Sequence, residues 1–130
     1  MMKITNRQIV EIHNSIGVVR KKNLPIKVGF AINRNMKAME PVAEAYSAEQ
    51  RKILDKYCEK DEFGQFKTEG DTFVLSDTKA YAKEMEELVA IESEVQVHTV
   101  SMDEIEKCDN EKYDALTPNE LSLLEFMIED

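Results

Sequence analysis

The sequence contains little glycine, proline, cysteine or aromatic side chain. Among 130 residues there are four glycines, three prolines, two cysteines and no tryptophan. The scarcity of glycine and proline argues against long disordered or low-complexity tracts. Two cysteines, Cys58 and Cys108, are too few for a disulfide scaffold. With 42% apolar and 33% charged residues, the length and composition predict one folded domain, residues 1–130.

Long apolar runs are also missing. No stretch approaches the roughly 20 consecutive apolar residues that a membrane-spanning helix needs, so we expect no membrane association. The first residues, MMKITNRQIV, lack the apolar region and the small-residue cleavage site of a secretory signal. We therefore expect a protein that works in a cytoplasm, where both cysteines are reduced thiols.

Motifs for catalysis, metal binding and cofactor binding are absent as well. His13, His98 and the two cysteines do not occur at the C-x-x-C or H-x-x-x-H spacings that place two ligands around one ion. The four glycines are isolated, so the sequence has no loop of the kind that cradles a nucleotide phosphate. No serine or cysteine lies in a recognisable nucleophile motif. The sequence therefore predicts a protein that is not an enzyme and that has no cofactor and no metal.

The net charge of −9 is divided unequally along the chain. Residues 1–60 carry 12 Lys and Arg against 6 Asp and Glu, whereas residues 61–130 carry 5 against 20. Either the two halves face each other within one fold, or a face of one sign meets a partner of opposite sign. We expect no direct nucleic-acid binding, which requires a cationic footprint. The cations of the first half are better explained as a solvated face, formed by RKKN (20–23) with Arg34, Lys37, Arg51, Lys52 and Lys56.

Helical periodicity dominates the first half. Thr5 and Gln8 have the spacing of a capping box, and one apolar stripe follows at Ile9, Ile12, Ile16 and Val19. A second stripe runs through Val28, Ile32, Met36, Met39, Ala43, Tyr46, Ile53 and Tyr57. Pro41 interrupts it, because its ring clashes with the carbonyl of Lys37 and it donates no hydrogen bond. We expect either a kinked long helix or two helices that meet near Glu40, packed as an antiparallel hairpin on the first helix.

The middle of the chain has strand character. Turn residues at Gly64 and EGD (69–71), with strand-forming residues at Phe66 and TFVL (72–75), predict a short hairpin. The alternation in EVQVHTV (94–100) predicts a strand that joins this hairpin in a small antiparallel sheet of about three strands. Between them, Ser76 or Asp77 caps a helix. That helix has one side formed by Tyr81, Met85, Leu88 and Glu92, and solvated charges at Glu84, Glu86 and Glu87.

Two further helix starts follow. Ser101 and Glu104 have capping-box spacing, and LTPNELSLLEFMIED (116–130) places Thr117 at the N-cap, Pro118 at N1 and Glu120 at N3. The last helix is apolar on most sides, and such a helix is normally buried in its own core. The alternative is a surface for self-association or for a protein partner. The residues that would bind this partner are Leu121, Leu124, Phe126, Met127 and Ile128.

The assembled segments resemble a family of small phage and prophage proteins of low-GC Gram-positive hosts, a domain of unknown function. The resemblance runs almost end to end through MKITNRQIVEIHNSI, LPIKVGFAINRNMKAME, EKDEFGQFK, SEVQVHTVSMDEIE and LTPNELSLLEFMIED. Its most specific features are the LP-K step after the first helix, the EKDE-G turn and the capped C-terminal helix. Pro41 departs from the uninterrupted helix expected there. The resemblance implies a viral origin and expression in the host cytoplasm, and it implies no mechanism.

These observations predict an α+β fold. It has an N-terminal helical hairpin whose second helix is kinked at Pro41, a small antiparallel sheet, and flanking helices that include the apolar C-terminal one. We expect a non-catalytic phage accessory protein, a morphogenesis or virion-associated component, whose partner is another phage or host protein or a second copy of itself in a homo-oligomer. One alternative is an acidic inhibitor of a host defence or nucleic-acid-binding protein. The other is an unrecognised enzyme.

Overall fold

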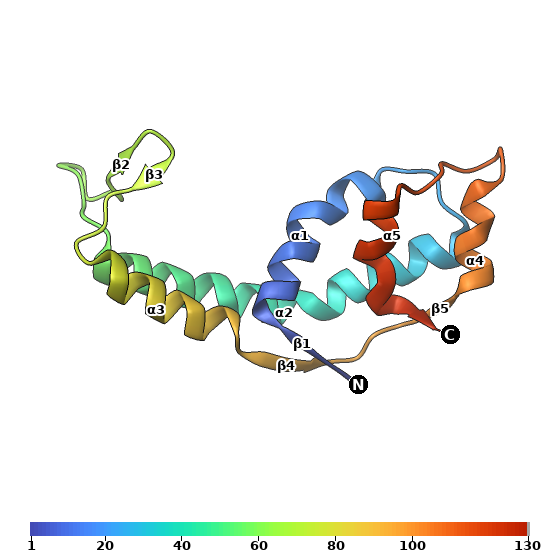
Figure 1. Ribbon diagram of the computed structural model, residues 1–130, viewed down its shortest axis with the longest axis horizontal. Helices are drawn as coiled ribbons and strands as arrows, with labels where there is room; N and C mark the ends of the chain where they lie inside the picture. Colours follow the sequence, from blue (N-terminus) through green and yellow to red (C-terminus); the bar gives the residue numbers. More distant parts are fainter. Residues whose placement is uncertain (130) are drawn as a thin grey trace.

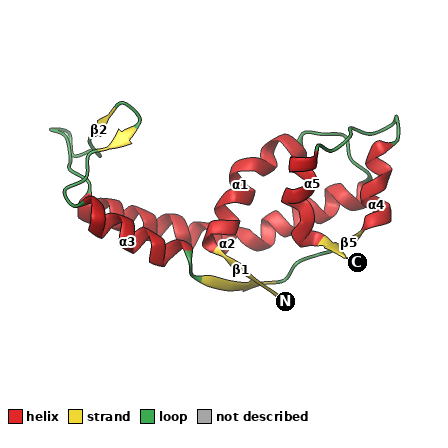
Figure 2. Ribbon diagram, in the orientation of Figure 1, coloured by secondary structure: helices red, strands yellow, loops and turns green. Residues whose placement is uncertain are grey.

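The computed structural model describes residues 1–129 and shows an elongated, mostly helical α+β protein (Figures 1 and 2). One long helix, α2 (Ile26–Tyr57), runs through nearly the whole length of the molecule. The other helices gather around its N-terminal half to form a body, and α3 (Thr78–Val89) lies along its C-terminal half to form an arm. A small hairpin occupies the far end of the arm (Figure 1).

The remaining elements are short. The chain begins with β1 and α1, and the hairpin at the end of the arm consists of β2 and β3. After α3 the chain returns to the body through β4, β5, α4 and the 3-10 turn η1, and it ends with α5, η2 and β6. Their bounds are β1 Met2–Thr5, α1 Asn6–Arg20, β2 Thr68–Glu69, β3 Thr72–Phe73, β4 Glu92–Val95, β5 Val100–Ser101, α4 Met102–Glu106, η1 Lys107–Asp109, α5 Pro118–Leu124, η2 Glu125–Met127 and β6 Ile128–Glu129.

The first helix forms as its sequence predicts. Thr5 and Gln8 make the capping box: the Thr5 hydroxyl accepts from Gln8 N at 3.2 Å, and the Gln8 side chain accepts from Thr5 N at 2.9 Å. The predicted stripe is buried, at Ile9, Ile12, Ile16 and Val19. This face packs against α2, so α1 and α2 form the predicted helical hairpin across the short loop 21–25.

The second helix passes through Pro41 without a break, so the predicted alternative of two helices is wrong. Pro41 is exposed, and water can therefore hydrate the Lys37 carbonyl that the proline leaves without its helical partner. Packing on both sides of the proline holds the helix together. Ala31, Ile32 and Met39 are buried in the body, and Leu54 is buried within the arm.

The strands form three separate pairs rather than the predicted three-stranded sheet. The β2–β3 hairpin is confirmed, but it sits alone at the end of the arm. The strand predicted to join it, residues 94–100, forms only in part: β4 overlaps it at Glu94 and Val95. β4 instead pairs antiparallel with β1, with Met2 opposite Val95 and Thr5 opposite Glu92. β5 pairs in parallel with β6. α3 spans about 18 Å at 1.5 Å per residue, and this length carries the chain from the hairpin back to the body before β4 begins.

The arm is tied to the body at its base. Asn6 is buried, donates from its side chain to the Leu88 carbonyl at 2.8 Å, and donates from its backbone to the Ile91 carbonyl at 3.0 Å. Asp77 is the N-cap of α3 and accepts from Ala80 N. Glu92, predicted on the apolar side of this helix, lies in β4 because α3 ends at Val89.

The core lies in the body. Its buried members come from α1, α2, β1, β4, β5, α4, α5 and η2: Ile4, Ile9, Ile12, Ile16, Val19, Val28, Ala31, Ile32, Met36, Met39, Val95, Val100, Ile105, Leu124 and Met127. Along the arm, by contrast, the predicted stripe residues Ala43, Tyr46, Ile53 and Tyr57 are only half-buried. A two-helix arm has a single interface, so each helix covers one side of the other.

Candidate functional site

The candidate site is the C-terminal end of the chain, residues 116–129, which we call the C-terminal segment. Its helix starts as predicted. Thr117 N donates to Glu120 Oε1 at 2.8 Å, and Glu120 N donates to the Thr117 hydroxyl at 3.2 Å, with Pro118 at the first helical position. The helix is shorter than predicted, however. It ends at Leu124, and the 3-10 turn η2 and the strand β6 follow. The expectation of one continuous apolar helix through Ile128 is therefore wrong.

This change of backbone shape decides which apolar side chains face inward. Leu124 and Met127 are 0% exposed and belong to the core. They are unavailable to a partner in this structure, which corrects the prediction that they bind one. Leu121, Phe126 and Ile128 remain half-buried and pack at the edge of the core. For these three the partner-binding prediction stands as a prediction.

Leu121 and Ile128 line a groove of about 220 Å³ between α5 and α4, which we call the C-terminal groove. Its apolar wall also includes Leu116 and Met102, the latter 48% exposed. Three acidic residues stand around it: Glu106, Asp109 and Glu125. All three are exposed. The groove therefore combines an apolar floor with a negative rim, a combination that suits an apolar side chain flanked by cations.

Leu123 and Phe126 point to the other side of the segment, toward α1 and β1. They line a shallower hollow of about 440 Å³ with Met2 and Ile12. Leu123 also borders the surface around Val18, which is 65% exposed on α1. The C-terminal segment thus has apolar edges on two sides. Acids border both of them: Glu11 and Glu125 line the hollow on the α1 side, and three acids line the groove on the α4 side.

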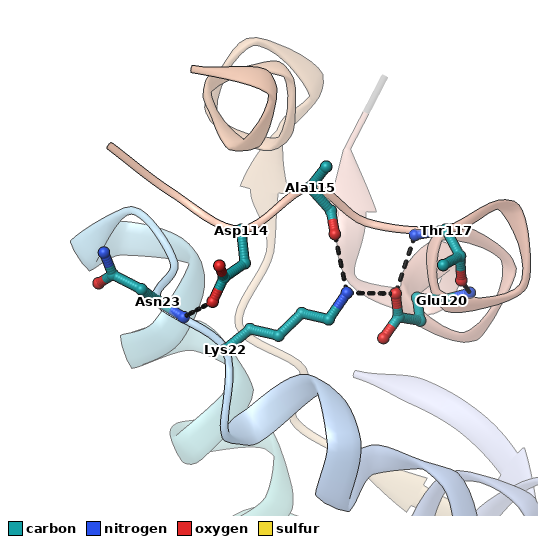
Figure 3. A network of polar contacts seen from close by, with 6 residues as sticks. All are labelled: Lys22, Asn23, Asp114, Ala115, Thr117 and Glu120. Atoms are coloured by element: carbon teal, nitrogen blue, oxygen red, sulfur yellow. Dashed lines mark hydrogen bonds and ion pairs between the residues drawn. The ribbon is translucent and has the colours of Figure 1, made fainter. Parts of the chain in front are cut away.

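A polar network fastens this segment to the loop between α1 and α2 (Figure 3). Lys22 Nζ donates to Glu120 Oε1 at 2.7 Å and to the Ala115 carbonyl at 2.8 Å. Asn23 N donates to Asp114 Oδ2 at 2.7 Å, and Asp114 N donates back to the Asn23 carbonyl at 2.9 Å. The hydrogen bond from Lys22, followed by that from Thr117 N, lowers the pKa of the Glu120 carboxyl. This ion pair is largely shielded from solvent, so it is worth more than an exposed one.

Four ion pairs, that of Lys22 among them, join the cationic first half to the acidic second half. Arg7 pairs with Glu86, Lys22 with Glu120, Lys27 with Glu104 and Lys56 with Glu84. These contacts favour the first interpretation of the charge asymmetry, in which the halves face each other. They also correct the expectation that Glu84 is simply solvated: the Tyr57 hydroxyl and then the Lys56 ammonium hold its pKa below the usual value.

Asn35 is a buried polar residue with a structural role that the sequence analysis missed. It is 0% exposed, its Nδ2 donates to the His98 carbonyl at 2.9 Å, and its Oδ1 accepts from His98 N at 2.7 Å. The Asn35 side chain thus pairs with the His98 backbone as a neighbouring strand would, and it fixes the extended residues 96–98 on α2. The sequence did contain a signal for this role, because Asn35 is a polar residue beside the apolar stripe at Ile32 and Met36.

The two cysteines and two histidines lie in different parts of the structure. No group of three His, Cys, Asp or Glu side chains that could hold a metal ion occurs in residues 1–129. Cys58 lies at the end of α2 and Cys108 in η1, both buried and both free thiols. Burial raises the pKa of Cys108. His13 and His98 are exposed.

Two broader observations complete the description. No helix among the described residues has both the length and the apolar character needed to cross a membrane. Comparison with protein-family models found no matching family, and comparisons with curated proteins and with solved structures found no match.

Proposed function

We propose that this chain is a non-catalytic phage accessory protein that binds another protein through the C-terminal groove. The observation that carries the proposal is the acid-rimmed apolar groove between α5 and α4. Leu121 and Ile128 lie at the edge of the core and form the floor of the groove. The buried residues Leu124 and Met127 anchor the C-terminal segment in the core. A partner that fits presents an apolar side chain beside lysine or arginine.

The network at Lys22 supports this role. Lys22 and Asn23 hold residues 112–120 through five hydrogen bonds. The partners are the Lys112 and Ala115 carbonyls, the Glu120 side chain, and both the backbone and the side chain of Asp114. A groove wall fixed in this way loses little conformational freedom on binding, and preorganisation of this kind increases affinity. The phage origin and the host-cytoplasm or virion location belong to the same proposal and rest on the sequence resemblance.

The test is affinity capture from phage-infected host cells, with mass-spectrometric identification of the bound protein. Leu121→Asp and Met102→Glu place charge in the groove, and we expect both to abolish capture while the far-ultraviolet circular dichroism stays native. Val18→Asp is the matched control, because it places the same charge on the exposed apolar surface at the α1 side. Loss of capture in Val18→Asp with retention in Leu121→Asp would refute the groove as the binding surface.

A second candidate function is an acidic inhibitor of a host nucleic-acid-binding protein. One observation favours it: most acids from residue 61 onward form no ion pair with the described part of the chain. Salt separates the two candidates. Binding by long-range charge alone weakens strongly as salt rises above about 0.15 M. Binding in the C-terminal groove should weaken less, because its apolar floor contributes in addition to the acidic rim.

A further inference from the structure

A second groove lies on the body at the α2 side, away from the C-terminal groove. It has a volume of about 580 Å³ and runs between the exposed face of α2 and the extended residues 96–98. We call it the α2 groove. Its main lining residues are Phe30, Arg34, Lys37, Gln96 and His98. The Asn35 side chain fixes one wall to the other through the His98 backbone, so the groove is built into the fold.

The α2 groove carries positive charge that no ion pair within the described residues neutralises. Arg34 and Lys37 lie one helical turn apart, both are exposed, and neither forms an ion pair within residues 1–129. Lys22 and Lys27 in the same part of the molecule are both paired with acids. Glu40, the next acid along α2, is exposed and makes no such pair with Lys37.

Beside these cations the groove offers an aromatic surface. Phe30 is 56% exposed, and its ring meets the His98 ring edge to face at 5.9 Å between centroids. The Arg34 guanidinium carbon lies 6.0 Å from the Phe30 centroid, at the limit of a cation–π contact. The guanidinium thus lies near the exposed ring, and its planar set of N–H donors suits carboxylate ligands.

We infer that the α2 groove binds an acidic segment of a partner protein. Carboxylates of that segment pair with Arg34 and Lys37, and an apolar side chain between them packs on Phe30 and His98. The wall from Phe30 to Ala38 is about 12 Å long at 1.5 Å per residue, which matches three to four extended residues at about 3.3 Å each. Complementary charge selects the segment: two free cations and an aromatic floor match two acids around one apolar residue.

A protein segment fits these observations better than a nucleic acid does. Two free cations neutralise about two phosphates, and the affinity of nucleic-acid binding grows with that number. The net charge of −9 repels a longer polyanion beyond the groove. This second binding site is separate from the C-terminal groove and does not depend on the function proposed for it.

The experiment uses fluorescence anisotropy of a fluorescein-labelled Glu-Glu-Phe-Glu-Glu peptide titrated with the full chain. We expect saturable binding that weakens between about 50 mM and about 500 mM salt. The double variant Arg34→Glu with Lys37→Glu should weaken binding by about tenfold or more, because two attractive pairs become repulsive. The matched control is Lys79→Glu with Lys83→Glu, which makes the same change of net charge at exposed sites on α3 and should change the affinity less than about twofold.

Several outcomes would overturn the inference. They are the absence of saturable binding, an equal loss in the Lys79/Lys83 control, and equal binding of a Lys-Lys-Phe-Lys-Lys peptide. Tighter binding of a five-nucleotide single strand would make the groove a phosphate site instead. Self-association that disappears in the Arg34/Lys37 variant would make the occupant a second copy of this chain. The Leu121→Asp variant should retain peptide binding, so failure of the C-terminal groove remains distinguishable from failure of this site.

Discussion

Replacing Asn35 with alanine tests whether one buried amide holds residues 96–98 against α2. The substitution removes both hydrogen bonds to His98, of 2.9 and 2.7 Å, together with a weaker one from the Asn35 amide to Met127 Sδ at 3.6 Å. It leaves the His98 N–H and carbonyl without their partner. A buried backbone group without a partner costs about 1–3 kcal/mol. Water can reach these two groups from the open α2 groove that Asn35 and His98 both line. We therefore take the lower part of that range for each of the two groups and expect a total loss of about 2–3 kcal/mol in the free energy of unfolding.

The measurement is urea denaturation followed by circular dichroism, with linear extrapolation to water. Asn33→Ala is the matched control: it lies on the same helix, and its side chain accepts only an exposed hydrogen bond of 3.3 Å from Arg20. Its cost should stay within about 0.5 kcal/mol. In Asn35→Ala the His98 amide should also lose protection from hydrogen exchange. Stability equal to that of the Asn33→Ala control, with the His98 amide still protected, would refute the reasoning.

Asn35→Asp sharpens the same test through its pH dependence. The aspartate keeps an acceptor for His98 N–H but turns a second oxygen toward the His98 carbonyl, in a position that is 0% exposed. Burial raises the pKa of such a carboxyl above its unfolded value. The folded variant therefore binds more protons than the unfolded one, and its stability relative to the native chain must fall as pH rises through that interval. If the difference in the free energy of unfolding between Asn35→Asp and the native chain did not change with pH, this account would be contradicted.

Three further predictions concern the C-terminal segment and Pro41. The carboxyl of Glu120 has a pKa below its ordinary value of 4.5, so the folded chain binds fewer protons there than the unfolded chain. The stability that this group contributes is present above pH 4.5 and is lost as pH falls through the folded pKa. Glu120→Gln should therefore cost about 1 kcal/mol at pH 7 and progressively less in acid, measured by urea denaturation across pH. Leu124→Ala should cost about 2–5 kcal/mol because Leu124 is fully buried, whereas Leu121→Ala should cost about 1 kcal/mol. Pro41→Ala should raise the free energy of unfolding by about 1–3 kcal/mol, since it restores a backbone donor in an exposed helix interior.

Each of these predictions has its own contrary result. An acid transition that is the same in Glu120→Gln and in the native chain would mean that the Lys22–Glu120 pair does not contribute. Equal costs for Leu124→Ala and Leu121→Ala would mean that the segment does not divide into core and groove residues. A Pro41→Ala variant of unchanged or lower stability would mean that α2 is not one continuous helix through this position.

The local features of the chain were predictable because they depend on near neighbours in sequence. The capping boxes at Thr5 and Thr117, the N-caps at Ser101 and Asp77, and the β2–β3 hairpin all appear where the sequence places them. Each is a hydrogen bond or turn that closes within a few residues. The apolar stripe of α1 was equally clear, since helical periodicity identifies the buried face before the partner is known.

Features that depend on distant segments were not predictable. The strand pairs β1–β4 and β5–β6 bring together residues about 90 and 30 positions apart, and strands of two to four residues leave almost no periodic signal. The candidate site shows the same limit. Its apolar composition was evident, but the division of its side chains between core and groove was not.

The amino-acid sequence by itself determined where helices begin, which faces of α1 and α2 are apolar, and how charge is distributed along the chain. Tertiary structure decided that α2 continues through Pro41, because packing at Met39 and Leu54 outweighs one lost hydrogen bond. It also decided that the last helix stops at Leu124, where the chain turns so that β6 can pair with β5. A backbone conformation that no local signal encodes thereby sends Met127 into the core and leaves Ile128 at the groove.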